Sequence, residues 1–315
     1  MVVRICTYIF EVWGQPPNMT GWASTLTIAG SDHDWPSKLK EMLSQKQWSS
    51  NLSKIVEKLK NGTRLSIADG HELYQHKNLY EIGQLANMVK LSRYGKHVFF
   101  NSNVHINQTN ICVLACKFCA FRRSKRQADA YELSIDGYLE EMDKYSDIVD
   151  EVHSVGGLHP DWNVEHYEGL IKAAKRKYPE IAMKALTAVE IKHLSLQSGI
   201  SFHETLSRLK SAGLDSLPGG GAEILNDEVR EIICKGKESS DEYLEIHRQA
   251  HSLGMPSNCT MLFGTIESIG DRLLHMDKLR QLADEHNLFQ CFVPYPFLPD
   301  STRLPEAQLA TSNEV

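Results

Sequence analysis

The sequence of 315 residues lacks an apolar run that reaches the roughly 18 residues of a membrane-spanning helix. It also lacks an excess of positive charge, because the formal net charge is −6, and this argues against a general nucleic-acid-binding protein. The apolar tract near the start has no small-residue cleavage pattern, so no signal peptide is predicted. The composition is otherwise that of a globular protein, with 42% hydrophobic and 23% charged residues.

The cysteines do not form the even, paired set of a disulfide framework. Seven cysteines are an odd number, and four of them are isolated in the sequence: Cys6, Cys234, Cys259 and Cys291. Scattered thiols of this kind are typical of a reducing compartment, so we expect a cytoplasmic protein.

The other three cysteines stand in one short stretch, Cys112-Val-Leu-Ala-Cys116-Lys-Phe-Cys119. Three thiolates at CxxxCxxC spacing suit a soft metal site, whereas a structural zinc ion would need a fourth Cys or His. An iron–sulfur electron carrier would need four protein ligands per cluster, and no fourth cysteine is near in sequence. A cube held by three cysteines leaves one iron open to a substrate. The remaining alternative is three cysteines that merely share a loop.

The chain divides into three parts. Residues 1–45 show no clear period and stay unassigned, and residues 46–96 show the apolar spacing of amphipathic helices. Residues 97–315 alternate strand and helix signals, with strands expected at 98–109, 150–155, 181–189, 214–217, 256–263 and 289–297. Six such repeats predict an α/β domain with a parallel sheet, and periodicity alone leaves open whether the sheet is doubly wound or forms a barrel.

The first strand has two different faces. Its apolar residues are expected to face outward toward helices, and they are Val98, Phe100, Val104 and Ile106. Its polar residues are expected to face the inside of a barrel, and they are Asn101, Asn103, His105 and Asn107. A polar interior of this kind must hold water or a polar ligand. The alternative is an edge strand with one wet face.

Distinctive motifs follow the second and third strands, at the end where βα barrels carry their chemistry. Gly156-Gly157-Leu-His159 follows the second strand, and His159 is a candidate for substrate contact or proton transfer, or else a histidine in a capped turn. Thr187 and Glu190 follow the third strand. The Glu190 carboxylate suits ribose hydroxyls, or else it caps the next helix.

A glycine run follows the fourth strand, Gly219-Gly220-Gly221-Ala-Glu223. Three glycines cost stability at a strand end, so we expect this backbone to pack against a ligand beside Glu223.

The cysteine motif, with Phe118 just before its last cysteine, resembles the signature of the radical S-adenosylmethionine (SAM) superfamily. The resemblance implies a (βα)6 partial TIM-like barrel with a 4Fe–4S cluster at its C-terminal mouth, held by Cys112, Cys116 and Cys119. It implies SAM as a co-substrate, cleaved to methionine and a 5′-deoxyadenosyl radical. The string around Met261 and Gly264 resembles the adenine-contacting strand, although Met261 also fits an ordinary core position and Thr265 replaces the usual His. The candidate cofactor contacts are Phe118, Gly156, Gly157, Thr187, Glu190, Met261 and Gly264.

Four longer strings resemble one branch of this superfamily, the aminofutalosine synthases of the futalosine menaquinone pathway. They are Asn-x-His-Ile-Asn-x-Thr-Asn-x-Cys, Gly-Gly-Leu-His-Pro-Asp-Trp, Lys-Ala-x-Thr-Ala-Val-Glu and Leu-Pro-Gly-Gly-Gly-Ala-Glu. Lys184 and Thr187-Ala-Val-Glu190 favour this branch over the cyclic dehypoxanthine futalosine synthases and the deazaflavin (FO) synthases, which more often have His and Ser-Pro there.

The resemblance implies a reaction and its participants. The adenosyl radical adds to the enol-ether double bond of 3-(1-carboxyvinyloxy)benzoate, and loss of the carboxyl carbon gives 6-amino-6-deoxyfutalosine. The electron comes from a reductase donor such as flavodoxin or ferredoxin. The catalytic candidates are His159 and Lys184, and Lys184 is a candidate partner for the substrate carboxylates. The candidate substrate contacts are Asn101, Asn103, His105, Gly219, Gly220, Gly221 and Glu223.

The end of the sequence carries one further expectation. Thr311 and Glu314 have the spacing of a capping box, so a helix is expected to begin where the sequence stops. The resemblance implies that the last barrel helix and further C-terminal elements are missing. An inactive, truncated iron–sulfur-binding protein is therefore the alternative to an active enzyme.

Overall fold

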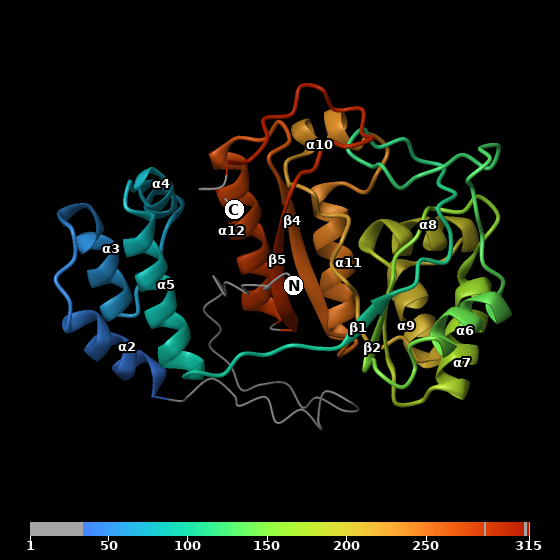
Figure 1. Ribbon diagram of the computed structural model, residues 1–315, viewed down its shortest axis with the longest axis horizontal. Helices are drawn as coiled ribbons and strands as arrows, with labels where there is room; N and C mark the ends of the chain where they lie inside the picture. The colour runs from blue at the N-terminus through green and yellow to red at the C-terminus, as the bar shows by residue number, and fades with distance from the viewer. Residues whose placement is uncertain (1–33, 287, 312–313, 315) are drawn as a thin grey trace.

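The computed structural model describes residues 34–286, 288–311 and 314. Most of the segment 1–45 that the sequence left unassigned therefore lies outside the described residues. From β1 onward, short strands are separated by one or more helices (Figure 1). The helices are α2 (Trp35–Ser44), α3 (Ser50–Lys60), α4 (Ile67–Gln75), α5 (Leu79–Tyr94), α6 (Ile135–Asp143), α7 (Val164–Lys177), α8 (Ala188–Ser198), α9 (Phe202–Ala212), α10 (Asp227–Ile233), α11 (Ser240–Ser252) and α12 (Ile269–Glu285). The strands are β1 (Asn103–His105), β2 (Glu151–Ser154), β3 (Ala182–Ala185), β4 (Ser257–Phe263) and β5 (Phe289–Pro296).

The strands form a parallel array in the order of the chain. β1, β2 and β3 pair in parallel, as do β4 and β5. The segment expected as the fourth strand is reduced to two parallel bridges, from Ser216 to Lys184 and from Leu217 to Ser257. These bridges connect β3 to β4 through one short strand-like segment. Six strand segments are thus present at the predicted places, no helix follows β5 among the described residues, and the fold is a partial barrel.

The two faces of the array are chemically different. Val152, Met183 and Ala185 belong to the main apolar core, and helices α6 to α9 cover this side of β2 and β3 (Figure 1). His105, His153 and Lys184 are in register on the opposite face. Because successive side chains of a strand alternate between faces, the polar set points to the inside of the barrel.

The first strand is shorter than expected. Val98 and Phe100 were expected to be covered by helices, but they are 78% and 89% exposed, so this prediction is wrong. The reason is that the chain here is still crossing from α5 to the barrel (Figure 1), and strand pairing starts only at Asn103. Ile106 is buried in the core as expected.

Helices α2 to α5 form a separate bundle beside α12 (Figure 1). α2 lies within the segment that the sequence left unassigned, and its Leu39 and Leu43 share a small apolar core with α3 and α5. The bundle is held to the barrel by an Arg64–Asp284 ion pair of 2.5 Å. No described helix has the length and apolar character that crossing a bilayer requires.

Candidate functional site

The three clustered cysteines lie on a loop that is held from several sides. The Lys117 amide donates to the Ile233 carbonyl at the end of α10 (2.8 Å), and the Val113 amide donates to the Leu158 carbonyl after β2 (3.0 Å). All three cysteines are free thiols, and Cys116 is buried. Burial raises the pKa of Cys116 to about 11, with Cys112 and Cys119 close enough to add to this effect. Among the described residues, no three His, Cys, Asp or Glu side chains converge on the geometry of a single metal ion.

The paired glycines after β2 pack directly against the loop. A Cβ on Gly157 would lie 2.2 Å from the Ile111 carbonyl oxygen, and one on Gly156 would lie 2.7 Å from Nε2 of Gln108. The Gly157 amide donates to the Thr109 carbonyl (2.9 Å). Larger residues here would push the cysteine loop away, so the glycines set its position. Within the described part of the chain, no group donates to their own carbonyl oxygens.

Glu190 lies beside the glycine pair and is fully buried at the start of α8. One carboxylate oxygen accepts from the amide and hydroxyl of Thr187 (2.8 and 2.7 Å), and the other accepts from the Gly156 amide (2.9 Å). Burial raises the pKa of Glu190. The capping role that the sequence left open is therefore present, and both oxygens of Glu190 have partners within the protein.

His159 is held at both ring nitrogens. Nε2 lies 2.7 Å from the Glu132 carboxylate, and Nδ1 accepts from the Asp161 amide (3.2 Å). Its ring stacks on Trp162, with centroids 4.3 Å apart. The geometry matches the capped-turn interpretation of His159, because neither nitrogen is available for proton transfer without breaking a contact.

Lys184 belongs to a charged cluster inside the barrel. Its ammonium lies 2.9 Å from Glu151, which is completely buried and also contacts His153. The Asn101 amide donates to the same carboxylate (2.5 Å), and Asn103 donates to Asn101 (3.3 Å). Burial alone would raise the pKa of Glu151, but the His153 and Lys184 contacts outweigh burial and lower it. His105, which is exposed, lies against His153 with ring centroids 5.0 Å apart.

Two polar atoms of uncharged side chains on this inner face are buried without a hydrogen-bond partner among the described residues. They are Oγ of Ser216 and Oδ1 of Asn258. The bridge to Lys184 places Ser216 on the inner face. Leu217 and its bridge partner Ser257 therefore lie on the outer face, and Asn258, the residue after Ser257, lies on the inner face. Buried acceptors of this kind cost about 1–3 kcal/mol each when unpaired, which favours a polar ligand inside the barrel.

The glycine run after Ser216 packs against the protein rather than against open space. Gly219 and Gly221 have φ of +80° and +100°, and a Cβ on Gly219 would lie 2.2 Å from the Asn258 carbonyl oxygen. A Cβ on Gly220 would lie 2.9 Å from Thr187. The sequence predicts a ligand beside these glycines, whereas the structure shows a tight turn that packs against β4. Glu223, the acid of the same motif, forms an ion pair with Lys237 (2.5 Å).

The fifth-strand candidates lie on the outer side of the sheet or in a turn. Met261 is 4% exposed and belongs to the apolar core, as its alternative interpretation expected. The Gly264 amide donates to Glu267 (2.7 Å), and its φ is +85°. A Cβ there would lie 2.8 Å from the Ala310 amide nitrogen, so the C-terminal segment covers this turn. The predicted capping contact at the end is present, since Glu314 accepts from the amide and hydroxyl of Thr311 (both 2.9 Å).

The sequence of residues 106–279 matches the Radical SAM superfamily. The chain belongs to the radical SAM superfamily. It is 42% identical over 251 residues to aminodeoxyfutalosine synthase of Thermus thermophilus, and 39% identical over 251 residues to that of Streptomyces coelicolor. These alignments cover 79% and 78% of this chain, and 68% and 64% of the two relatives. The predicted resemblance is confirmed, and the protein is an enzyme of this superfamily.

Solved structures agree on the fold. Methylornithine synthase aligns with a TM-score of 0.65 at 17% identity, covering 81% of this chain and 72% of that structure. The FeFe-hydrogenase maturase HydG from Carboxydothermus hydrogenoformans aligns with a TM-score of 0.63 at 18% identity, covering 85% and 62%. A cyclic dehypoxanthine futalosine synthase of Streptomyces coelicolor is also similar, at 33% identity over 267 residues, covering 83% of this chain and 67% of the relative.

The cofactors of a radical SAM enzyme are a 4Fe–4S cluster and SAM, as the sequence predicted. The donor set fits the cluster, because three free thiols stand on one loop and Cys112 and Cys119 act on Cys116. The Gly156–Gly157 backbone packs against Gln108 and Ile111, which places it directly beside the loop that would hold the cluster.

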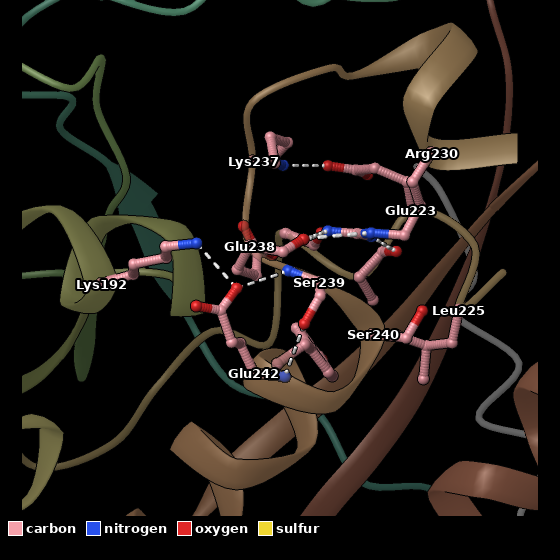
Figure 2. Close-up of polar contacts among 12 residues, drawn as sticks. Lys192, Glu223, Leu225, Arg230, Lys237, Glu238, Ser239, Ser240 and Glu242 are labelled. Atoms are coloured by element: carbon pink, nitrogen blue, oxygen red, sulfur yellow. Dashed lines mark hydrogen bonds and ion pairs between the residues drawn. The ribbon is translucent and has the colours of Figure 1, made fainter. Parts of the chain in front are cut away.

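Sequence reasoning missed several charged residues of this radical SAM protein. Glu151 and His153 alternate with apolar residues in β2, and this period-2 pattern could have assigned them to the inside of the barrel. Lys237 lies near Phe118 and Cys116 of the cysteine loop only through tertiary packing, and no local pattern marks it or its neighbours Arg230 and Glu238 (Figure 2).

Proposed function

We propose that this protein is a C–C bond-forming radical SAM transferase with aminodeoxyfutalosine synthase activity in menaquinone biosynthesis. It would join the 5′-deoxyadenosyl group of SAM to 3-(1-carboxyvinyloxy)benzoate. The observation that carries this proposal is the 42% and 39% identity to two aminodeoxyfutalosine synthases, from Thermus thermophilus and Streptomyces coelicolor. The cysteine loop supports the radical chemistry, and the charged barrel interior supports an anionic substrate.

The substrate carries two carboxylates, and these need cationic or hydrogen-bonding partners. Lys184 is the cation on the inner face, and Glu151 holds its ammonium in place at 2.9 Å. Ser216 stands on the same face, and its hydroxyl is a donor without a partner among the described residues. The Asn258 side chain offers an amide there. These groups would orient the enol ether, and the surrounding core would exclude water from the reacting carbon.

The methionine part of SAM would lie at the loop side of the same interior. When bound, the cluster supplies the electron that cleaves SAM, and a low-potential donor such as flavodoxin or ferredoxin would replace that electron. The Gly156 and Gly157 carbonyls would accept hydrogen bonds from the SAM ammonium. Glu190 would act indirectly, because it holds the Gly156 amide (2.9 Å) and thereby fixes the direction of this peptide.

The proposal is tested by incubating anaerobically reconstituted protein with SAM, dithionite and the enol ether. We expect SAM and the enol ether to be consumed in equal amounts. The control is the same incubation without the enol ether. SAM cleavage that does not depend on the enol ether would reject this substrate. The relative named cyclic dehypoxanthine futalosine synthase, at 33% identity, gives the second candidate reaction.

A further inference from the structure

Figure 2 shows a buried group of four charges, formed by Glu223, Arg230, Lys237 and Glu238. Lys237 pairs with Glu223 at 2.5 Å, with side chains 7% and 13% exposed. Arg230 lies 3.3 Å from Glu238, with side chains 4% and 0% exposed. The group is electrically balanced, yet four charges removed from water are costly to keep. Packing alone does not explain them, because apolar residues would fill the same space at lower cost.

Glu223 is held in an unfavourable backbone conformation to reach Lys237. Its φ is +44°, in the left-handed region that non-glycine residues rarely occupy. Its carbonyl accepts from the Leu262 amide (2.8 Å), which fixes the residue against β4. Strained non-glycine residues of this kind cluster at functional sites. The strain therefore points to a function for the ion pair that Glu223 makes.

Lys237 is the member of the group that faces the cysteine loop. Its ammonium lies 5.7 Å from the ring centroid of Phe118, the residue before Cys119. The chain around Lys237 is fixed to the loop as well, since Ile233 accepts from the Lys117 amide (2.8 Å). The Lys237 charge also acts on the buried Cys116 thiol. A positive charge is thus held close to Phe118 and Cys116 of the loop.

We propose that Lys237, held by Glu223, is an electrostatic positioning residue that raises the reduction potential of the 4Fe–4S cluster. This inference rests on the cluster assignment in the proposed function. Reduction adds one negative charge to the cluster, and a cation nearby stabilises the reduced form more than the oxidised form. Because the site is buried, solvent screens this interaction less than at a surface. Glu223 moderates the effect by placing a negative charge next to the ammonium.

The test is an anaerobic redox titration of the reconstituted cluster, followed by electron paramagnetic resonance. Lys237→Met should shift the midpoint potential to more negative values, and Glu223→Gln should shift it to more positive values. Lys237→Arg should stay near the wild type. The double variant Lys237→Met/Glu223→Gln should return toward the wild type, because it removes both charges. The matched control is Lys235→Met, since Lys235 pairs with Glu231 and its side chain is 78% exposed.

The opposite signs of the two single variants separate an electrostatic role from a structural one. A purely structural role would lower cluster content in both variants, or move both potentials in one direction, and either result overturns the inference. If Lys237→Met does not retain iron, the sign of the Glu223→Gln shift decides alone. An absence of iron in the wild-type protein would instead reject the cluster assignment on which the proposed function depends.

Discussion

The Lys184 ammonium and the Glu151 carboxylate lie 2.9 Å apart inside the barrel, and Glu151 is completely buried. The two residues come from adjacent strands, since Lys184 is on β3 and Glu151 on β2. A buried ion pair holds both side chains in one geometry, so Lys184 is presented to the barrel interior in a fixed direction. That direction is where the proposed substrate carboxylate would bind.

Replacement of Lys184 by methionine should destabilise the fold strongly. The change leaves the Glu151 carboxylate buried without its cation, and breaking a buried pair in this way costs about 3–5 kcal/mol. Urea denaturation would measure the free energy of unfolding. The double variant Lys184→Met/Glu151→Gln should recover part of the loss. A loss in the single variant below about 1 kcal/mol would show that the pair is not desolvated.

Cys116→Ala should abolish the cluster. Cys116 is the middle one of the three proposed ligands, and the two remaining thiolates would not hold a cube. Iron and sulfide content and the visible absorption after anaerobic reconstitution measure the result. The matched control is Cys291→Ser on β5, away from the loop, which should retain the wild-type iron content. Four irons retained in Cys116→Ala would remove Cys116 from the ligand set.

Glu190→Ala should lower the stability of the protein by about 2 kcal/mol. The change removes the cap of α8 and leaves the buried Gly156 amide without its acceptor. We also expect weaker SAM binding, because the Gly156 peptide loses its fixed direction. Denaturant unfolding and a SAM dissociation constant measure the two effects. Glu204→Ala is the control, because Glu204 is exposed at the corresponding position of α9, and it should change neither quantity appreciably.

The free energy of unfolding should decrease as the pH falls below 6.5, the pKa of a free histidine side chain. Burial lowers the pKa of His251 to about 4 and that of His275 to about 3, from 6.5 for a free side chain. The unfolded chain takes up protons near pH 6.5 while the folded chain does not, so stability is full above pH 6.5 and is lost toward pH 4. His251 alone accounts for a loss of roughly 3 kcal/mol at the acidic end.

The measurement is denaturant unfolding at about pH 7.5 and about pH 4.5, the two sides of this window. His251→Gln should reduce the pH dependence, since it removes one of the groups that must stay neutral. His203→Gln, on the exposed side of α9, should leave the dependence unchanged. Equal stability of the wild type at both pH values would contradict the burial of these imidazoles as the cause.

The fold was largely predictable because it depends on local patterns. The helical stripes and short apolar runs placed six strand segments and the helices between them correctly, and the cysteine spacing identified the loop. The first strand was predicted too long because residues 98–100 have the right composition but no neighbouring strand to pair with. The fourth strand was predicted at the right place, although only Ser216 and Leu217 form bridges.

The site was less predictable because its contacts join distant parts of the chain. His159 looked available for proton transfer, yet Glu132 occupies one of its nitrogens across 27 residues of sequence. The glycines after Ser216 suggested a ligand, and the atoms that need the space belong to Asn258 on β4, to Thr187 and to Glu238. The contact of Lys237 with the cysteine loop depends on the path of α10, which no spacing in the sequence reveals.

The fate of the adenosyl group tests the central proposal most directly. Reconstituted protein would be incubated with the enol ether, dithionite and SAM labelled in the adenosyl group, and the products separated by chromatography with mass detection. Aminodeoxyfutalosine synthase activity predicts one product that carries the label covalently joined to the substrate carbons, absent with Cys116→Ala. Label released as free 5′-deoxyadenosine, in step with consumption of the substrate, would contradict this account and indicate hydrogen abstraction instead.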